Sequence, residues 1–145
     1  MPWCTEAYSI AESKKYIEEH VEGVEPRTTY EFAITDAKTG MYLGDCGLNH
    51  IESNNGYANL GYWVRTSQTR KGIATASTSL LAKFGVETLK LNRIEIVVAV
   101  GNKASQRVAA KVGATREGIL RNRIVVHDKI HDAVMFSIIP GDLIQ

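Results

Sequence analysis

The stretch LGYWVRTSQTRKGIATAS, residues 60–77, takes the chain from a strand pattern to a helix pattern through a short basic loop. An apolar run typical of a strand comes first, and from Gly72 onward apolar residues recur at helical spacing. The first N–H groups of a helix lack backbone acceptors and form the positive end of its dipole, so they attract anions. Gly72 allows close approach to the backbone, the small Ala74 keeps the opening clear, and Arg70 and Lys71 add positive charge. This junction is therefore a candidate phosphate-binding loop.

Taken alone, the loop is weak support for a phosphate site, because short basic loops are common and usually only solvated. The sequence contains no G-x-x-x-x-G-K-[ST] motif, and no G-x-G-x-x-G motif follows any strand. These two absences disfavour a nucleotide hydrolase and a nicotinamide-dependent enzyme.

The totals of the sequence describe one soluble domain. The chain has 145 residues, of which 44% are hydrophobic and 23% are charged, with a formal net charge of +1. A balance so close to neutral gives no overall positive field for nucleic acid, and we expect no nucleic-acid partner. The sequence has no run of membrane-spanning length and no signal peptide at its start, and its cysteines, Cys4 and Cys46, suit small buried positions in a reducing compartment. We expect a single cytoplasmic domain over residues 1–145 that does not enter a membrane.

Hydrophobic periodicity and turn residues divide the chain into alternating helices and strands. The expected order is a helix over residues 10–22, strands over 28–35, 41–51 and 57–65, a helix over 72–90, a strand over 93–100, a helix from Asn102 to Gly113, and two tail strands around a turn near Asp128 and Lys129. This order predicts one mixed domain of the α/β (α+β) class.

Several details of these elements can also be predicted. The helix over 10–22 opens with the capping-box pair Ser9 and Glu12. Gly44 and Gly47 interrupt the second strand, where a bulge is plausible. The strand over 93–100 is almost continuously apolar and is expected to be covered on both faces. The core side of the helix over 72–90 is expected to carry Ile73, Ala76, Leu80, Leu81 and Phe84.

Three segments together resemble a known family. The segments LGYWV (60–64), RKGIATAS (70–77) and NKASQRVAAKVGATREGILR (102–121) occur in the order and spacing of the Gcn5-related N-acetyltransferase (GNAT) superfamily. Within that superfamily, the chain is most similar to the Rim-type branch, which acetylates the N-terminal amines of ribosomal proteins. The resemblance extends from about Tyr30 to Pro140 and implies a mixed central sheet with splayed parallel strands, flanked by helices.

The resemblance also implies roles for particular residues. Acetyl-CoA would be the co-substrate, its pyrophosphate held by the loop from Arg70 to Ala74 and its pantetheine arm lying between the splayed strands. A main-chain N–H near Trp63 or Val64 would polarise the thioester carbonyl, and Ser105 would protonate the departing thiolate. The positions that match the cofactor-binding motifs are Trp63, Val64, Arg65, Thr69, Arg70, Lys71, Gly72, Ile73, Ala74, Asn102, Ser105 and Arg107.

The chain departs from the family pattern in three places. Thr69 stands where the phosphate loop usually has Gln or Arg, and Asn59 stands where the Rim-type branch has the glutamate proposed as the general base. An amide cannot accept a proton, so the base would be Glu31, Asp45 or His50, or the amine would enter already neutral, since an α-amine has a pKa near 8. The sequence also begins after the strand and helix with which family members usually start: either the true start lies upstream, or this is a shortened form whose exposed sheet edge would favour a homodimer or leave a structural defect.

The residues and the resemblance together predict an acetyl-CoA-dependent N-acetyltransferase that works by direct attack in a ternary complex. The expected acceptor is the α-amine of a protein or peptide, such as a ribosomal protein. The alternatives are a small-molecule amine as acceptor, or a catalytically impaired domain that binds acyl-CoA or another protein.

Several other side chains have simpler explanations. His127, Asp128 and His131 flank a turn and are interpreted as surface residues, so no metal site is expected. Arg121 and Arg123 are interpreted as solvated residues of an exposed strand, with an acidic partner as the alternative. One of Tyr62 and Trp63 is expected to pack in the core.

Overall fold

The computed structural model describes residue 11 and residues 28–143. Its elements, in chain order, are β1 (Tyr30–Thr35), β2 (Tyr42–Glu52), β3 (Tyr57–Val64), the 3-10 turn η1 (Thr66–Gln68), α2 (Ile73–Glu87), β4 (Arg93–Ala99), α3 (Lys103–Lys111), β5 (Thr115–Val126), β6 (Lys129–Ile138) and η2 (Pro140–Leu143). The predicted order is confirmed from the first strand onward. The predicted helix over residues 10–22, with its capping box, lies outside the described residues except for residue 11.

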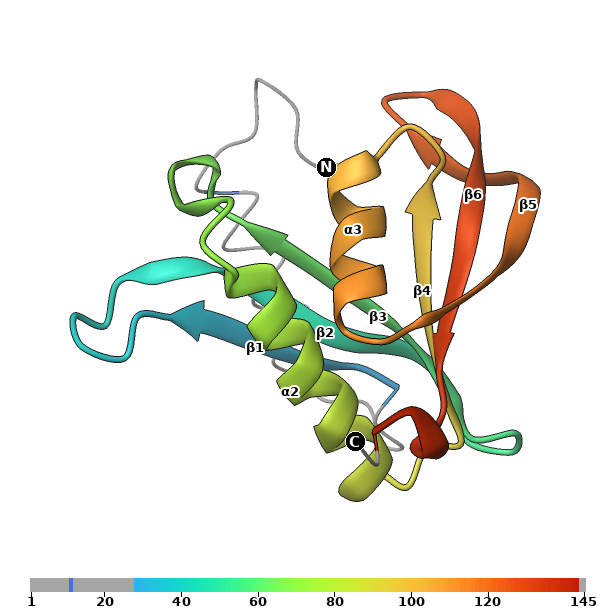
Figure 1. Ribbon diagram of the computed structural model, residues 1–145, viewed down its shortest axis with the longest axis horizontal. Coiled ribbons are helices and arrows are strands. Elements are labelled where there is room, and N and C mark those ends of the chain that lie inside the picture. The colour runs from blue at the N-terminus through green and yellow to red at the C-terminus, as the bar shows by residue number, and fades with distance from the viewer. Residues whose placement is uncertain (1–10, 12–27, 144–145) are drawn as a thin grey trace.

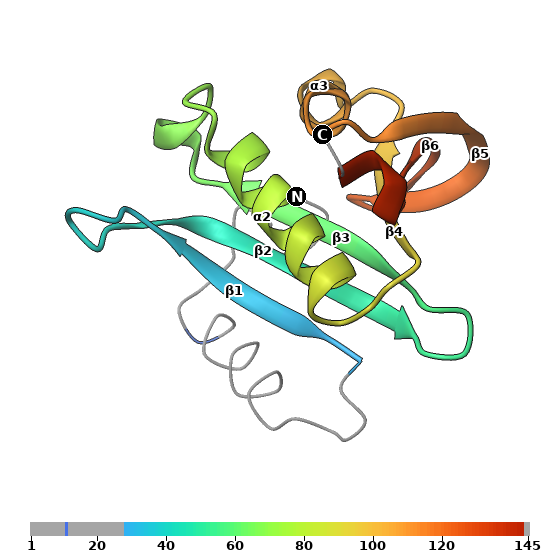
Figure 2. The ribbon, with the colours of Figure 1, turned by 60° about the horizontal axis from the view of Figure 1, so that its bottom comes forward.

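The strands form one mixed sheet with both described helices on the same side. The strand order is β1-β2-β3-β4-β6-β5, and every neighbouring pair is antiparallel except β3 and β4, which are parallel. Figures 1 and 2 show α2 and α3 side by side over one face of this sheet. The expected α+β class with a mixed central sheet is therefore confirmed.

The parallel strands β3 and β4 separate after three residues. Their register runs from Tyr57 opposite Arg93 to Asn59 opposite Glu95 and then stops, although β3 continues to Val64. Beyond that row each strand stays paired only on its other side, β3 with β2 and β4 with β6. The two strands diverge toward the upper edge of Figure 1, and this divergence is the predicted splay.

The core lies between α2, α3 and the sheet. Leu81 and Ala82 of α2 are buried with Leu48 and Ile94 of the sheet. At Gly85 the helix comes so close to the sheet that a Cβ would lie 2.9 Å from Cδ1 of Ile94.

The predicted apolar side of α2 is only partly right. Phe84 points inward, and its ring meets those of Tyr30 and Phe32 at centroid distances of 5.7 and 5.5 Å. Leu80, by contrast, is 70% exposed, and Ala76 is exposed as well. The helix packs against the sheet through Leu81, Ala82 and Gly85, so the side of the helix that carries Leu80 faces away from the sheet.

The bulge expected in the second strand is found at one of its two glycines. A bulge does occur beside Gly44, where the β1–β2 register passes from Ile34 opposite Gly44 to Thr35 opposite Tyr42. Gly47, however, is paired regularly with both neighbouring strands, and a further irregularity in β2 falls between Asn49 and Glu52 instead.

The strand β4 is not fully covered on both faces. Ile94, Ile96 and Val98 are buried under the helices, whereas the alternate residues, including Arg93 and Glu95, are half-buried. Charged side chains at alternate positions need water or ionic partners, which keeps this face partly open.

The turns that frame the site follow the prediction closely. Asn102 caps α3 by accepting a hydrogen bond from the Ser105 N–H at 3.1 Å, and Gly113 follows the helix with a left-handed φ of 86°. The tail hairpin turns at His127 and Asp128, one residue earlier than predicted, with φ values of 47° and 61°. Two left-handed residues in succession are typical of a type I′ hairpin turn.

Candidate active site

The basic loop forms a compact turn between β3 and α2. Within it, Gln68 N–H donates to the carbonyl of Arg65 at 2.8 Å, and Thr69 Oγ1 donates to the carbonyl of Thr66 at 2.9 Å. Lys71 Nζ donates to Gln68 Oε1 at 2.9 Å. The hydroxyl of Thr69, which stands where the family usually has Gln or Arg, thus stabilises the turn itself.

The loop presents the start of α2 to solvent. Gly72, the N-cap, has φ of 76°, and Arg70 also has a left-handed φ, 63°. The first main-chain hydrogen bond of the helix runs from the Ala76 N–H to the Gly72 carbonyl. The N–H groups at 73–75 therefore have no acceptor within the helix. No acidic side chain lies in this first turn, and Arg70 and Lys71 are exposed. Among the described residues, nothing lies within 4 Å of a Cβ built on Gly72. The geometry and charge therefore fit a pyrophosphate.

The open end of the splay lies between β3 and α3. Tyr62 points to the helix side of the sheet and packs against the core, as expected for one of the two aromatic residues, and its hydroxyl donates to the main-chain carbonyl of Ser105 at 3.3 Å. Burial raises the pKa of Tyr62 and outweighs a lowering by the Ser105 side chain, so its phenol remains neutral and able to donate at neutral pH. Tyr62 and Ser105 therefore meet where the two strands have parted.

The first turn of α3 holds the other predicted cofactor contacts. Asn102 is exposed and already used as the helix cap, Ser105 is half-buried, and Arg107 is exposed. Gln106, which the sequence did not single out, donates through Nε2 to the carbonyl of Val100 at 2.8 Å and so fixes the helix to the end of β4.

The face of the sheet opposite α2 carries the groups considered for proton transfer. Asn59 Nδ2 donates to Asn49 Oδ1 at 2.9 Å, in the last row shared by β3 and β4. Asp45 Oδ2 accepts from Tyr42 Oη at 2.6 Å and from Trp63 Nε1 at 3.2 Å.

Of the three candidate bases, Asp45 lies on β2, which pairs with β3, and Glu31 lies on β1, on the other side of β2. His50, also on β2, lies outside the regular register. Asp45 is opposite Trp63, and Glu31 is opposite Gly47. His50 is exposed with a left-handed φ of 49°, in the irregular part of β2. The structure therefore brings Asp45 and Glu31, rather than His50, to the same face as Asn59.

An ionic network that the sequence did not reveal links β4 to β5. Arg93 donates through Nε to Glu95 at 2.8 Å and through both Nη atoms to Glu117 at 2.6 and 2.7 Å. Ser137 Oγ also donates to Glu117, and the pKa of Glu117 falls to about 2, because of Arg93 first and Ser137 second. Alternating charges in the RIE segment were the available signal for this network.

The remaining candidates lie outside this arrangement. Arg121 and Arg123 are exposed, and Cys46 is a buried free thiol whose pKa is raised to about 11, chiefly by desolvation. Among the described residues no three His, Cys, Asp or Glu side chains form a group that could hold a metal ion.

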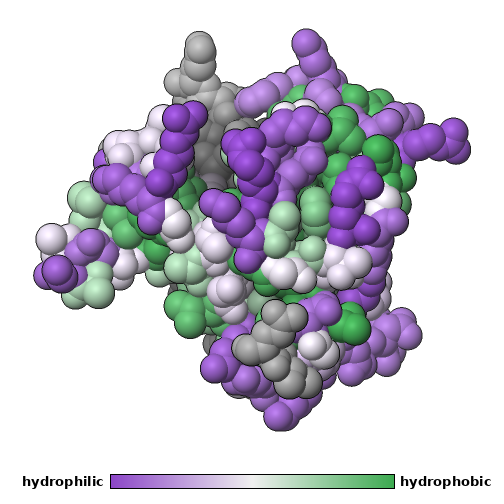
Figure 3. Space-filling view, in the orientation of Figure 1, coloured by the Kyte–Doolittle hydropathy of each residue, from purple (hydrophilic) through white to green (hydrophobic). Residues whose placement is uncertain are grey.

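No helix in the described part of the chain is long and apolar enough to cross a membrane. Figure 3 shows hydrophilic side chains over much of the outward surface of α3.

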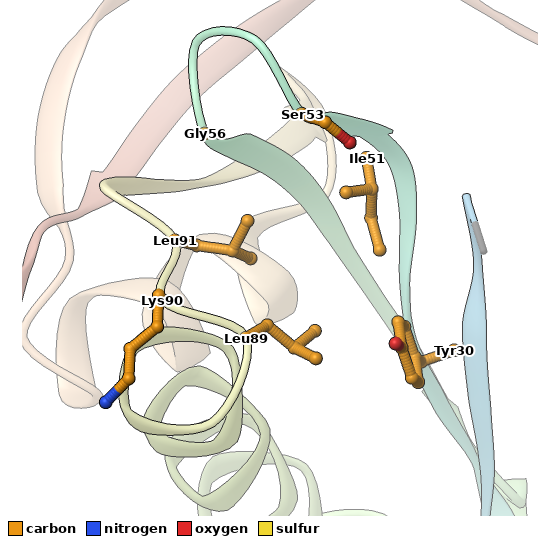
Figure 4. Close-up of a pocket in the computed structure, with 7 residues that line it drawn as sticks. All are labelled: Tyr30, Ile51, Ser53, Gly56, Leu89, Lys90 and Leu91. Atoms are coloured by element: carbon orange, nitrogen blue, oxygen red, sulfur yellow. The ribbon is translucent and has the colours of Figure 1, made fainter. Parts of the chain in front are cut away.

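A shallow pocket lies at the other end of the sheet. It is formed by the β2–β3 turn, the segment after α2 and the start of β1, and Figure 4 shows its lining residues, Tyr30, Ile51, Ser53, Gly56, Leu89, Lys90 and Leu91. This is the end at which β3 and β4 are still paired, so the pocket is distinct from the splayed end.

A splayed parallel pair beside the exposed, basic start of a helix is the arrangement that the sequence motifs led us to expect, and comparison with known proteins agrees. The family model for the acetyltransferase (GNAT) domain matches residues 1–115. The chain is a member of the GNAT family. Enzymes of the GNAT family use acetyl-CoA as the acetyl donor.

Individual GNAT proteins show the same relationship. The chain is 35% identical over 100 residues to "Putative ribosomal N-acetyltransferase YdaF" of Bacillus subtilis, an alignment that covers 69% of this chain and 55% of that protein. A structure named as a "putative ribosomal-protein-serine acetyltransferase" from Vibrio cholerae superposes with a TM-score of 0.82 at 28% identity, covering 92% of this chain and 76% of that one. Both names agree with the Rim-type branch.

A second GNAT structure shares the fold alone. The spermidine N-acetyltransferase SpeG of Vibrio cholerae (F149A mutant) superposes with a TM-score of 0.80 at 19% identity, covering 94% of this chain and 79% of that one.

Proposed function

We propose that this chain, acting as a single domain, transfers the acetyl group of acetyl-CoA to the α-amine at the N-terminus of a protein or peptide. The observation that carries the proposal is the loss of β3–β4 pairing after Asn59 and Glu95, directly beside the exposed start of α2. Unpaired main-chain groups at a splay are costly unless a ligand occupies them, and an extended pantetheine arm can do so.

The proposed site assigns a separate task to each element. The N–H groups at the start of α2, with Arg70 and Lys71, would hold the pyrophosphate, and Arg65 and Thr69 would shape that loop. Asn102, Ser105 and Arg107 of the α3 start would contact the cofactor arm. The main-chain N–H of Trp63 or Val64 would donate to the thioester carbonyl, where negative charge develops during acyl transfer.

Acetyl-CoA supplies the activated acetyl group, and the protein supplies orientation and proton transfer. The amine attacks directly while both substrates are bound, so no nucleophilic serine or cysteine of the protein is required. Ser105 would deliver a proton to the leaving sulfur. Its half-buried position in the first turn of α3, across the gap from β3, supports this role.

The choice of a peptide α-amine rests on the ribosomal names of the relatives with 35% and 28% identity. SpeG, at 19% identity, supports only the fold. A cytoplasmic location and a homodimer remain predictions of the sequence.

A two-stage experiment tests the proposal. Calorimetric titration with acetyl-CoA should give micromolar binding, and a weaker response to dephospho-CoA would indicate a contact with the ribose phosphate. Thiol release should then be measured with peptides bearing free N-termini and, in parallel, with spermidine. Faster turnover of spermidine would overturn the peptide assignment, and binding without turnover of any amine would favour an acyl-CoA-binding domain instead.

A further inference from the structure

The side chain of Glu31 lies flat across β2. Glu31 is paired with Gly47 in the β1–β2 register, on the face of the sheet opposite α2. A Cβ built on Gly47 would coincide with the Glu31 carboxylate, whose Cδ would be 2.5 Å and Oε1 2.7 Å away. Only a glycine at position 47 therefore lets this carboxylate reach over β2 toward the middle of the sheet.

The same row of the sheet continues to a second glycine at the splay. Gly47 is paired with Gly61 of β3, two residues beyond Asn59, where β3 has already left β4. Among the described residues, the nearest atom to a Cβ on Gly61 would be Nδ2 of Asn49, at 3.9 Å. We call Gly47 and Gly61 the glycine strip; it leads from the Glu31 carboxylate to the gap between the strands.

Polar pairs border the glycine strip on both sides. Asp45 and Trp63 form the row toward the open end of the splay, joined by the 3.2 Å hydrogen bond from the indole. Asn49 and Asn59 form the row toward the paired end, joined at 2.9 Å. The strip is thus a row without side chains of its own, with a polar pair on either side and a carboxylate at one end.

The charge of Glu31 acts at this position. The pKa of the Cys46 thiol, on the neighbouring residue of β2, is raised to about 11 by desolvation first and then by the charges of Glu31 and Asp45. This agrees with a Glu31 carboxylate that lies above β2 instead of extending from the sheet edge into solvent.

We propose that Glu31 binds the ammonium group of the acceptor above Gly61 and accepts its proton. This inference rests on the proposed acetyl transfer and assigns the base that Asn59 cannot provide. Strands lie about 4.8 Å apart and rise about 3.3 Å per residue. The carboxylate above Gly47 is therefore roughly 5 Å from Gly61 across the sheet, and the Trp63 amide is about 7 Å from Gly61 along β3. An ammonium group above Gly61 would lie between the two.

The chemical step balances with these groups. The ammonium passes one proton to the Glu31 carboxylate, and the freed lone pair forms the N–C bond to the acetyl carbon. The C–S bond breaks with its electron pair on sulfur, and the second amine proton ends on that sulfur, with Ser105 as the proposed relay. The products are the amide and the free thiol, and Glu31 releases its proton to solvent.

The primary test is Glu31→Gln, which keeps the shape of the side chain and removes its charge. We expect kcat/KM for the best peptide substrate to fall at least tenfold, while the calorimetric Kd for acetyl-CoA stays within twofold of wild type. Glu87→Gln is the matched control, because Glu87 is an exposed glutamate of α2 whose side chain is 61% exposed. It should change neither quantity.

Two further variants separate this role from a structural one. Gly47→Ala puts a methyl group where the carboxylate lies, and the atoms it meets are the flexible end of Glu31, so the strand itself is preserved. It should reproduce the loss of kcat/KM, and the double variant with Glu31→Gln should lose no more than either alone, since both remove the same contact. Asn59→Glu in the Glu31→Gln background should restore part of the rate by returning a carboxylate to the adjacent row.

An unchanged kcat/KM in Glu31→Gln would overturn the proposal for Glu31 and leave acetyl transfer intact. If wild type binds acetyl-CoA but acetylates no amine, the proposed function fails, and Glu31 is then judged by calorimetric binding of the peptides to the CoA-bound protein. Equal peptide affinity in wild type and Glu31→Gln, or no peptide binding at all, would overturn it there too.

Discussion

The hydroxyl of Tyr62 donates a 3.3 Å hydrogen bond to the main-chain carbonyl of Ser105, joining β3 to α3 across the gap between the splayed strands. The two residues are 43 positions apart in sequence, and the bond holds the first turn of α3 at a fixed distance from β3. Both Ser105 and the proposed carbonyl-binding N–H groups of Trp63 or Val64 depend on this spacing.

Removing the Tyr62 hydroxyl should loosen the site without dismantling it. A neutral hydrogen bond contributes about 0.5–1.5 kcal/mol net, so Tyr62→Phe should lower the free energy of unfolding by about 1 kcal/mol. For the same reason acetyl-CoA affinity should fall by less than about tenfold. Urea unfolding and calorimetry would check the two values. A complete loss of binding would show that the phenol contacts the cofactor directly.

A negative side chain at the start of α2 should abolish cofactor binding. Gly72→Glu places a carboxylate at the helix start and forces a left-handed φ of 76° on a residue with a Cβ. The conformational cost of about 1–2 kcal/mol should leave most of the protein folded. Calorimetry with acetyl-CoA measures the binding, and Gly72→Ala is the control that carries the conformational cost alone. Retained affinity in Gly72→Glu would contradict the assignment of the loop.

Loss of the Ser105 hydroxyl should affect turnover more than binding. The Asn102 cap uses the Ser105 main-chain N–H, so Ser105→Ala keeps the helix start. We expect kcat to fall by roughly 10²-fold or more if the hydroxyl delivers a proton, with the Kd for acetyl-CoA little changed. Equal losses in kcat and affinity would make Ser105 a binding residue.

The Arg93–Glu117 pair should give the protein an acid-sensitive component of stability. The pKa of Glu117 in the folded protein, about 2, lies below its value in the unfolded chain. Its contribution is therefore complete above about pH 5 and is lost as the pH falls toward 2. The side chain is 40% exposed, so solvent screening limits the contribution to about 1 kcal/mol.

Glu117→Gln should remove this part of the pH dependence. Unfolding free energies at pH 7 and pH 3 should differ less in the variant than in wild type. Glu87→Gln, which alters a 4.0 Å contact with Lys83 between largely exposed groups, should follow the wild-type curve. Parallel curves for all three proteins would contradict the prediction.

Replacing Thr78 with valine should stabilise the fold. Thr78 of α2 is fully buried, and among the described residues its Oγ1 has no hydrogen-bond partner. An unsatisfied buried hydroxyl costs about 1–3 kcal/mol, and valine has nearly the same shape without it. Tm should rise by about 3 °C for a domain of this size. Thr78→Ser keeps the hydroxyl and removes the methyl group, so it should lower Tm.

Local signals in the sequence determined where the elements begin and end. Asn102 and Gly113 are predicted from cap chemistry and Gly72 from the change to a helical period, signals that depend on nearby residues, and the structure places all three at helix ends. Tyr30 and Phe32 alternate with Glu31 in the sequence, which agrees with β1, where both rings turn to the same face and meet Phe84 of α2. The family motifs, which also occupy short continuous segments, led to the correct fold.

Contacts between strands were decided only by the tertiary structure. The sequence proposed Glu31, Asp45 and His50 as equal candidates for a base, since it carries no information on register. Pairing then placed Glu31 over Gly47 and Asp45 beside Trp63, and it left His50 in the irregular part of β2. The sequence likewise could not decide between Gly44 and Gly47 as the place of the bulge in β2. The bulge lies beside Gly44, whereas Gly47 makes room for a side chain from another strand, and that need is visible only when the strands are side by side.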